Sequence, residues 1–208
     1  MPKQKELSHM YHACTKIKNV TKQLLQYIVI ALLLSGCQTT AEKKADNVAM
    51  TAQQIDYEFA LGLLHDNKLS TAATKLSELI RNYPAMTGAY VNLALLNIRD
   101  NKLEDAESLL SKALSINPDY AAAHNYMGII YRNKGLFGKA EASYKKSLEL
   151  DPAYGIANLN LAILYDVYLD QGQLALGYYK RYQQLSMSKD DTVDKWVIEL
   201  ERRLQQQS

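Results

Sequence analysis

The sequence predicts an all-α fold, a solenoid of about four helix-turn-helix repeats followed by a C-terminal capping helix. Three observations support this. Pro84, Pro118 and Pro152 follow one another at intervals of 34 residues, small residues recur at fixed places between them, and apolar residues recur at helical spacing. Proline lacks an N–H and disfavours helical backbone just before it, so each of these prolines ends a helix.

The first element, residues 1–36, is basic and then apolar. Lys16, Lys18 and Lys22 precede the apolar run 24–34, which is too short to span a bilayer because a membrane helix needs about 20 residues. This is the pattern of a secretory signal peptide. A buried core helix or an uncleaved anchor would leave the basic flank and the abrupt polar exit unexplained. Both Met1 and Met10 are consistent with its start.

Four residues at the end of the apolar run, Leu34, Ser35, Gly36 and Cys37, resemble the lipobox of bacterial lipoproteins. The resemblance implies cleavage before Cys37 and attachment of a diacylglycerol to its thiol, and each buried methylene would then contribute ~0.8 kcal/mol to membrane binding. Gln38 stands where the inner-membrane retention signal usually has aspartate. The resemblance therefore implies a lipid-anchored protein on the periplasmic face of the outer membrane of a Gram-negative bacterium.

Residues 37–52 form the second element, a lipidated N-terminus and a polar, flexible tether. An extended chain reaches at most ~3.3 to 3.6 Å per residue, so the tether would keep the folded part close to the membrane. The other cysteine, Cys14, lies in the segment that cleavage removes. We therefore expect no disulfide.

The repeats occupy residues 53–188 and divide into four units, 53–86, 87–120, 121–154 and 155–188. Their pattern resembles the tetratricopeptide repeat (TPR), a pair of antiparallel helices, and the third unit fits it best. Small residues let the paired helices touch, because a larger side chain there would overpack at ~1 to 3 kcal/mol; they are Ala60, Ala72, Ala94, Ala106, Gly128 and Ala140. Asn67, Asn101 and Gly135 stand at the turns between the helices, where left-handed backbone is needed.

The fourth unit departs from the pattern and fits only with one extra residue in the turn near residues 169–171. An atypical last repeat is expected, because it has no successor to pack on. Residues 189–208 then carry apolar residues at helical spacing behind a cluster of aspartates. We interpret them as a capping helix and tail, with Trp196 as a lid on the last repeat.

No catalytic, metal-binding or cofactor site is predicted. The sequence has no CxxC, HExxH, GxSxG or phosphate-binding glycine loop, and His124 occupies a packing position of the repeat. We therefore expect a protein that is not an enzyme, with no metal, no cofactor and no small-molecule substrate. Residues 37–208 hold 19 basic and 21 acidic residues, without a basic face, which argues against nucleic acid as a partner.

The TPR resemblance implies that proteins bind along a concave groove lined by the first helix of each repeat. The groove positions of the family correspond here to Tyr57, Leu61, Leu64, Val91, Asn92, Leu95, Ile98, Asn125, Ile129, Arg132, Asn133, Leu159, Asn160, Ile163 and Asp166. The set is mostly aliphatic, with asparagines able to bond a peptide backbone. Any one aliphatic member could equally pack between adjacent repeats.

The carboxylate clamp of chaperone-binding TPR domains is a known specialisation of this groove. Its five positions hold Tyr57, Leu61, Asn92, Ala122 and Tyr126 here, and only Asn92 matches. The sequence therefore predicts no clamp and favours an apolar partner segment, either a helix or an extended peptide.

Small TPR lipoproteins of this layout include the pilotins of type IV pilus biogenesis, which escort secretin subunits to the outer membrane, and the TPR lipoproteins of tight-adherence pili. The resemblance implies a membrane-anchored periplasmic scaffold that binds envelope proteins and assists assembly of an envelope complex such as a pilus or secretin system. The alternative is an adaptor or regulator for a peptidoglycan-remodelling or polysaccharide-export complex. The partner and the oligomeric state stay open.

Overall fold

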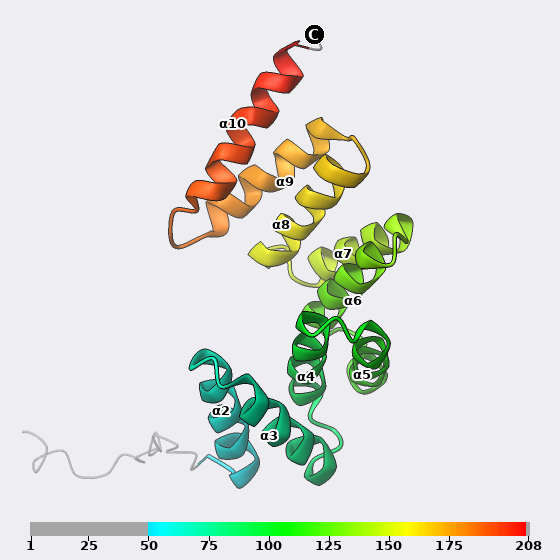
Figure 1. Ribbon diagram of the computed structural model, residues 1–208, viewed down its shortest axis with the longest axis vertical. Coiled ribbons are helices and arrows are strands. Elements are labelled where there is room, and N and C mark those ends of the chain that lie inside the picture. Colours follow the sequence, from blue (N-terminus) through cyan, green and yellow to red (C-terminus); the bar gives the residue numbers. More distant parts are fainter. Residues whose placement is uncertain (1–49, 207–208) are drawn as a thin grey trace, which may run out of the picture. The chain divides into compact units, whose positions relative to one another are not determined.

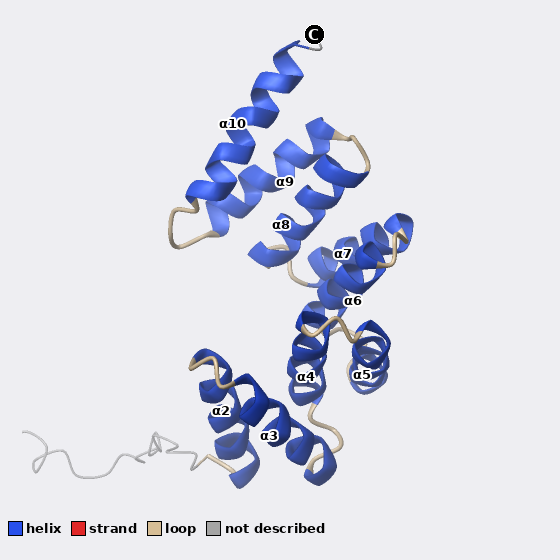
Figure 2. Ribbon diagram, viewed as in Figure 1, coloured by secondary structure: helices blue, strands red, loops and turns tan. Residues whose placement is uncertain are grey.

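The regular structure of the chain is helical wherever it is described. The computed structural model describes residues 50–206, and within them it contains nine α-helices and one π-helix and no strand (Figure 2). The predicted lipobox and signal peptide lie outside the described residues. The all-α prediction is confirmed.

The helices form four consecutive pairs and one final helix (Figure 1). The pairs are α2 (Ala52–His65) with α3 (Leu69–Asn82), α4 (Thr87–Arg99) with α5 (Leu103–Ile116), α6 (Ala121–Asn133) with α7 (Phe137–Leu150), and α8 (Gly155–Ile163), continued by the π-helix η1 (Leu164–Tyr168), with α9 (Gly172–Leu185). The final helix is α10 (Asp191–Gln206). Each helix packs on the next one in the chain, so the prediction of about four repeats and a C-terminal helix is confirmed.

Local signals in the sequence set where the helices begin and turn. Thr51 caps α2 with a capping box, in which its hydroxyl accepts the N–H of Gln54 (3.2 Å) and the Gln54 side chain accepts the N–H of Thr51 (2.8 Å). The turns inside the first three pairs have positive φ at Asn67 (58°), Asn101 (58°) and Gly135 (72°), as the sequence predicts. Asparagine and glycine tolerate this conformation better than other residues.

The fourth pair accommodates its extra residue inside the first helix, one turn earlier than the sequence predicted. The π-helix η1 ends with the N–H of Leu169 bonded to the carbonyl of Leu164 (3.1 Å), an i→i+5 bond. Such a bond encloses one more residue than an α-helical turn, so the helix continues while the chain gains a residue. The turn that follows then has positive φ at Asp170 (51°), in the place that Asn67, Asn101 and Gly135 occupy in the other pairs.

Small residues allow the paired helices to approach closely. Gly128 on α6 is buried, and a Cβ atom there would lie 2.5 Å from Cε1 of Tyr144 on α7, whose ring has no exposed surface. The alanines at the corresponding places have no exposed surface either; they are Ala60, Ala72, Ala94, Ala106, Ala140, Ala162 and Ala175. The paired helices can therefore approach closely because the residues at their contact points are glycine or alanine, which have little or no side chain.

The last helix closes the C-terminal end of the stack. Val193, Val197 and Leu200 on α10 are buried in one apolar cluster with residues of α8 and α9. Asp190 precedes the helix and accepts the N–H groups of Thr192 and Val193, and this bonding lowers the pKa of its carboxyl group. The Trp196 ring lies 6.1 Å from the ring of Tyr179 on α9 and is 41% exposed, so it covers the last repeat only partly.

We expect Gly128→Ala to lower the free energy of unfolding by about 1 to 3 kcal/mol, because the added methyl group would overlap the enclosed Tyr144 ring. Gly138→Ala is the matched control. Position 138 also lies in a helix, but a Cβ there meets no atom within 4 Å, so alanine should be neutral or stabilise by up to about 1 kcal/mol. Urea unfolding followed by circular dichroism measures both, and equal midpoints for the two variants would contradict this account of the packing.

Candidate functional site

The predicted groove residues lie on the first helix of each pair. Tyr57, Leu61 and Leu64 are on α2, Val91, Asn92, Leu95 and Ile98 on α4, Asn125, Ile129, Arg132 and Asn133 on α6, Leu159, Asn160 and Ile163 on α8, and Asp166 on η1. Helix α4 contacts α6, and α6 contacts α8. We call the surface that carries these residues the first-helix face.

The residues of this face differ in how open they are to a partner. Val91, Asn125 and Asn160 are buried, whereas Asn133 is exposed. Several half-buried aliphatic residues also pack against the core clusters; they are Leu64, Ile98, Ile129, Leu159 and Ile163. Leu61 and Leu95 are half-buried and belong to none of these clusters. Of the aliphatic residues on this face, Leu61 and Leu95 are therefore the least involved in packing the core.

Hydrogen bonds link neighbouring repeats across the face. Asn92 Nδ2 donates to the hydroxyl of Tyr57 (2.8 Å), and Asn160 Nδ2 donates to Oδ1 of Asn125 (2.9 Å). Both bonds join residues 35 positions apart, so they occupy equivalent places in different pairs of repeats. The amide nitrogens of Asn92 and Asn160 are thus used within the protein, although the sequence suggested that the asparagines could hold a peptide backbone.

The Tyr57 hydroxyl lies over a glycine that sequence reasoning did not single out. A Cβ atom at Gly88 would overlap this hydroxyl, so a larger residue there would require the Tyr57 ring to shift. Burial, with smaller contributions from Tyr120 and Glu58, raises the pKa of Tyr57 to about 12. The hydroxyl is therefore neutral at physiological pH and keeps a proton to donate.

A group of tyrosines at the start of α6 and α8 is a second feature that sequence reasoning missed. Burial raises the pKa values of Tyr126 and Tyr154, whose side chains share a hydrogen bond, and Tyr120 lies close enough to affect both. A shallow hollow of about 280 Å³ lies beside them, lined by Asp119, Tyr120, Ala121, Ala122, Asp151 and Tyr154. The available signal was a tyrosine directly before each of these helices.

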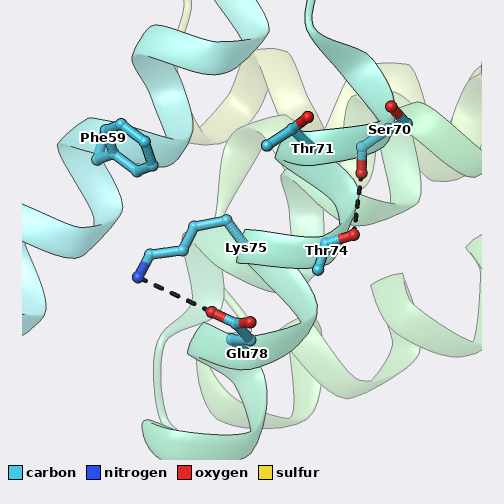
Figure 3. A pocket seen from close by; sticks show the side chains of 6 residues that line it. All are labelled: Phe59, Ser70, Thr71, Thr74, Lys75 and Glu78. Atoms are coloured by element: carbon cyan, nitrogen blue, oxygen red, sulfur yellow. Dashed lines mark hydrogen bonds and ion pairs between the residues drawn. The ribbon is translucent and has the colours of Figure 1, made fainter.

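Another hollow, of about 310 Å³, lies between α2 and α3 (Figure 3), and none of the predicted groove residues lines it. Phe59, which is 58% exposed, lines it from α2, and polar residues of α3 complete it; they are Ser70, Thr71, Thr74, Lys75 and Glu78. The Lys75 ammonium is bound to Asp56 (2.8 Å), and the Thr74 hydroxyl donates to the carbonyl of Ser70 (3.1 Å). The main polar groups of this hollow are thus paired within the chain.

The charged residues of the first-helix face have different environments. The Asp166 side chain is 11% exposed, and its Oδ1 lies 2.5 Å from Nη2 of Arg203 on α10. Tyr179 also donates to Asp166 (3.4 Å). By contrast, Nε and Nη1 of Arg132 are buried and have no hydrogen-bond partner among the described residues. The acid on this face is thus neutralised within the chain, and the arginine is not.

The described residues show no metal-binding cluster. Within residues 50–206, no three side chains of His, Cys, Asp or Glu come together in a way that could hold a metal ion. The His124 ring lies 2.8 Å from the carbonyl of Pro118, and His65 lies beside Asp66 (3.7 Å). None of the helices in this range is both long and apolar enough to cross a membrane.

Comparison with known families identifies the repeats. One family model described as a tetratricopeptide repeat matches residues 57–121, and a second with the same description matches residues 121–154. Residues 57–154 consist of tetratricopeptide repeats. TPR folds generally serve as non-catalytic scaffolds for protein interaction. Among curated proteins, no sequence matches this chain.

Solved structures with a similar fold are also TPR-like. A thermophilic TPR protein of Thermus thermophilus is 25% identical, with a TM-score of 0.62 over 74% of this chain and 82% of that one. PilF of Pseudomonas aeruginosa is 17% identical, with a TM-score of 0.65 over 74% of this chain and 69% of that one. MamA of Desulfovibrio magneticus RS-1 is 18% identical, with a TM-score of 0.53 over 66% and 77%. At these identities the similarity shows the TPR solenoid fold.

We expect Arg203→Met to lower the free energy of unfolding by about 1 to 2 kcal/mol, because the enclosed Asp166 carboxylate would lose its cation while water screens part of the loss. The control is Arg202→Met, which breaks only the exposed pair with Glu199 and should leave stability unchanged. Thermal melts of the two variants at low and high salt measure the difference. A larger effect from Arg202→Met would contradict the role given to Arg203.

Proposed function

We propose that this protein is a lipid-anchored scaffold in the periplasm of a Gram-negative bacterium, which holds a partner protein on its first-helix face and assists assembly of an outer-membrane complex such as a pilus or secretin system. The observation that carries the interaction role is the run of TPR repeats over residues 57–154. Repeats of this kind present one continuous face from many short helices, which suits a protein ligand.

The composition of the first-helix face supports a protein partner with apolar residues. Leu61 and Leu95 are half-buried outside the core clusters, and the hydroxyl of Tyr57, on the same helix as Leu61, is neutral. Aliphatic contacts and a few hydrogen-bond donors are what recognition of a helix or extended segment requires. The hollow of 280 Å³ is shallow, and the main polar groups of the hollow of 310 Å³ are bonded to other groups of the same chain. Neither hollow therefore offers a small-molecule substrate much to bind.

The cellular part of the proposal rests on the sequence. Leu34, Ser35, Gly36 and Cys37 match a lipobox behind a basic and apolar leader, and Gln38 favours the outer membrane. The fold shared with PilF of Pseudomonas aeruginosa is consistent with a role of this kind. An adaptor for a peptidoglycan or polysaccharide complex would use the same anchor and the same face, so the identity of the captured partner separates the two.

We expect Cys37→Ser to abolish labelling by a radioactive or clickable fatty acid and to release the protein from the membrane fraction into the soluble periplasm, because serine has no thiol to carry the lipid. Cys14→Ser is the control and should change neither property, since residue 14 lies in the segment to be removed. Fractionation and intact-mass measurement follow both variants. Membrane retention of unlabelled Cys37→Ser protein would contradict lipid anchoring.

We expect the double variant Leu61→Asp, Leu95→Asp to reduce capture of the native partner by about tenfold or more, because burying a carboxylate in an apolar interface is strongly unfavourable. The measurement is in vivo photo-crosslinking from position 133, an exposed position on the first-helix face, followed by affinity purification and mass spectrometry. Leu174→Asp, at a 50% exposed position on the second helix α9, is the control and should leave capture unchanged. Capture that survives the double variant would place the binding surface elsewhere, and circular dichroism checks that both variants are folded.

A further inference from the structure

Arg132 on α6 is a partly enclosed cation without a counter-charge. Two of its guanidinium nitrogens, Nε and Nη1, are buried and have no hydrogen-bond partner among residues 50–206. No carboxylate in that range forms an ion pair with it, whereas Asp166 on the same face is paired with Arg203. Nor does its charge lie over an aromatic ring of the described chain, as the charges of Lys139 and Lys145 do. Within the described residues, neither a carboxylate nor an aromatic ring thus compensates for the desolvation of these two nitrogens.

Arg132 lies near the junction of the third and fourth repeats. The π-helix η1 carries Tyr168, whose ring lies 5.0 Å from the ring of Phe137 on α7. Arg132 and Tyr168 both lie close enough to the Tyr144 hydroxyl to affect its pKa, which burial raises to about 12. That hydroxyl is therefore neutral and protonated, and like the arginine it has no partner among the described residues. Two donors without a partner among the described residues, the Arg132 guanidinium and the Tyr144 hydroxyl, therefore lie close together near this junction.

A third unmet donor lies on the same side of α6. Nδ2 of Asn125 is buried and unpartnered within the described chain, because only the oxygen of that amide is used, as the acceptor of Asn160. Residues 125 and 132 are seven positions apart, which places them on one face of a helix, two turns from each other. The first-helix face of the third repeat therefore has an excess of donors over acceptors, around a cation that is only half-buried.

We propose that Arg132 binds a carboxylate of the partner segment, so that the partner presents an acidic group among apolar residues to the junction of the third and fourth repeats. The inference rests on the proposed function, since it assumes that the first-helix face binds a protein. A guanidinium suits this ligand because its planar donors match a carboxylate and because it keeps its charge at any physiological pH. Ile129, Leu159 and Ile163 on the same face supply the aliphatic surroundings.

The carboxylate can come from an Asp or Glu side chain or from a chain terminus, and four labelled peptides distinguish these sources. All share one leucine- and serine-rich sequence; the first has a central Glu and an amidated C-terminus, the second Gln and an amidated C-terminus, the third Gln and a free C-terminal carboxylate, and the fourth Lys and an amidated C-terminus. Their affinities for the full chain are measured by fluorescence anisotropy.

We expect the Glu peptide to bind wild-type protein about 10- to 100-fold more tightly than the amidated Gln peptide, the range for a hydrogen-bonded ion pair, and the Lys peptide to bind most weakly. The preference should disappear in Arg132→Met and persist in Arg99→Met, which removes an exposed arginine of the preceding repeat. Preference for the free C-terminus instead of Glu, also lost in Arg132→Met, would support the carboxylate site and name its source. Equal binding of the Glu and Gln peptides, or no binding of any, would overturn the proposal.

Stability provides an independent readout. Arg132→Met keeps the apolar stem and removes an unpaired cation, so the melting temperature should stay the same or rise, whereas loss of a structural arginine would lower it and overturn the proposal. Failure here is separable from failure of the proposed function. If Leu61→Asp, Leu95→Asp abolishes partner capture while Arg132→Met leaves capture and peptide preference unchanged, the scaffold role stands and the carboxylate site does not.

Discussion

The close approach of two helices within each repeat is the constraint on which the rest of the structure depends. It requires a residue with little or no side chain on each helix at the point of contact, and Gly128 shows how tight the contact is, since even one methyl group would overlap Tyr144. When the helices of a pair are fixed in this way, their first helices are presented in series, with α4 against α6 and α6 against α8. The candidate binding face is a product of this packing, because its residues come from segments far apart in the sequence.

The sequence predicted the repeats well because their determinants are local. Pro84, Pro118 and Pro152 end helices through their own backbone chemistry, and Asn67, Asn101 and Gly135 mark turns through their tolerance of positive φ. The place of the extra residue in the fourth repeat was missed for a physical reason. One extra residue can be accommodated either in a turn or in a π-helix, and the residues that follow have the same register in both cases. The two cases differ by one i→i+5 hydrogen bond at Leu169, which the sequence pattern does not reveal.

The sequence predicted which residues lie on the first helices, but not the hydrogen bonds and ion pairs that these residues form. Family spacing placed all fifteen groove residues on first helices, yet it could not show that Asn92 and Asn160 bond to the preceding repeats. Those bonds depend on the exact stagger of one repeat on the next, as does the space that Gly88 leaves for Tyr57. The same limit applies to charge. Asp166 and Arg132 occupy equivalent places in consecutive repeats, and only the structure shows that Arg203, 37 residues away, neutralises the former alone.

The two ends of the solenoid differ in how their apolar faces are covered. Helix α10 packs on α9, and Val197 on it is buried in one apolar cluster with residues of α8 and α9. Trp196 and Ile198 on the same helix are exposed. At the other end, Ile55 and Phe59 of α2 are more than half exposed. Through the ion pair of Arg203 with Asp166, α10 also neutralises the acidic residue of the first-helix face.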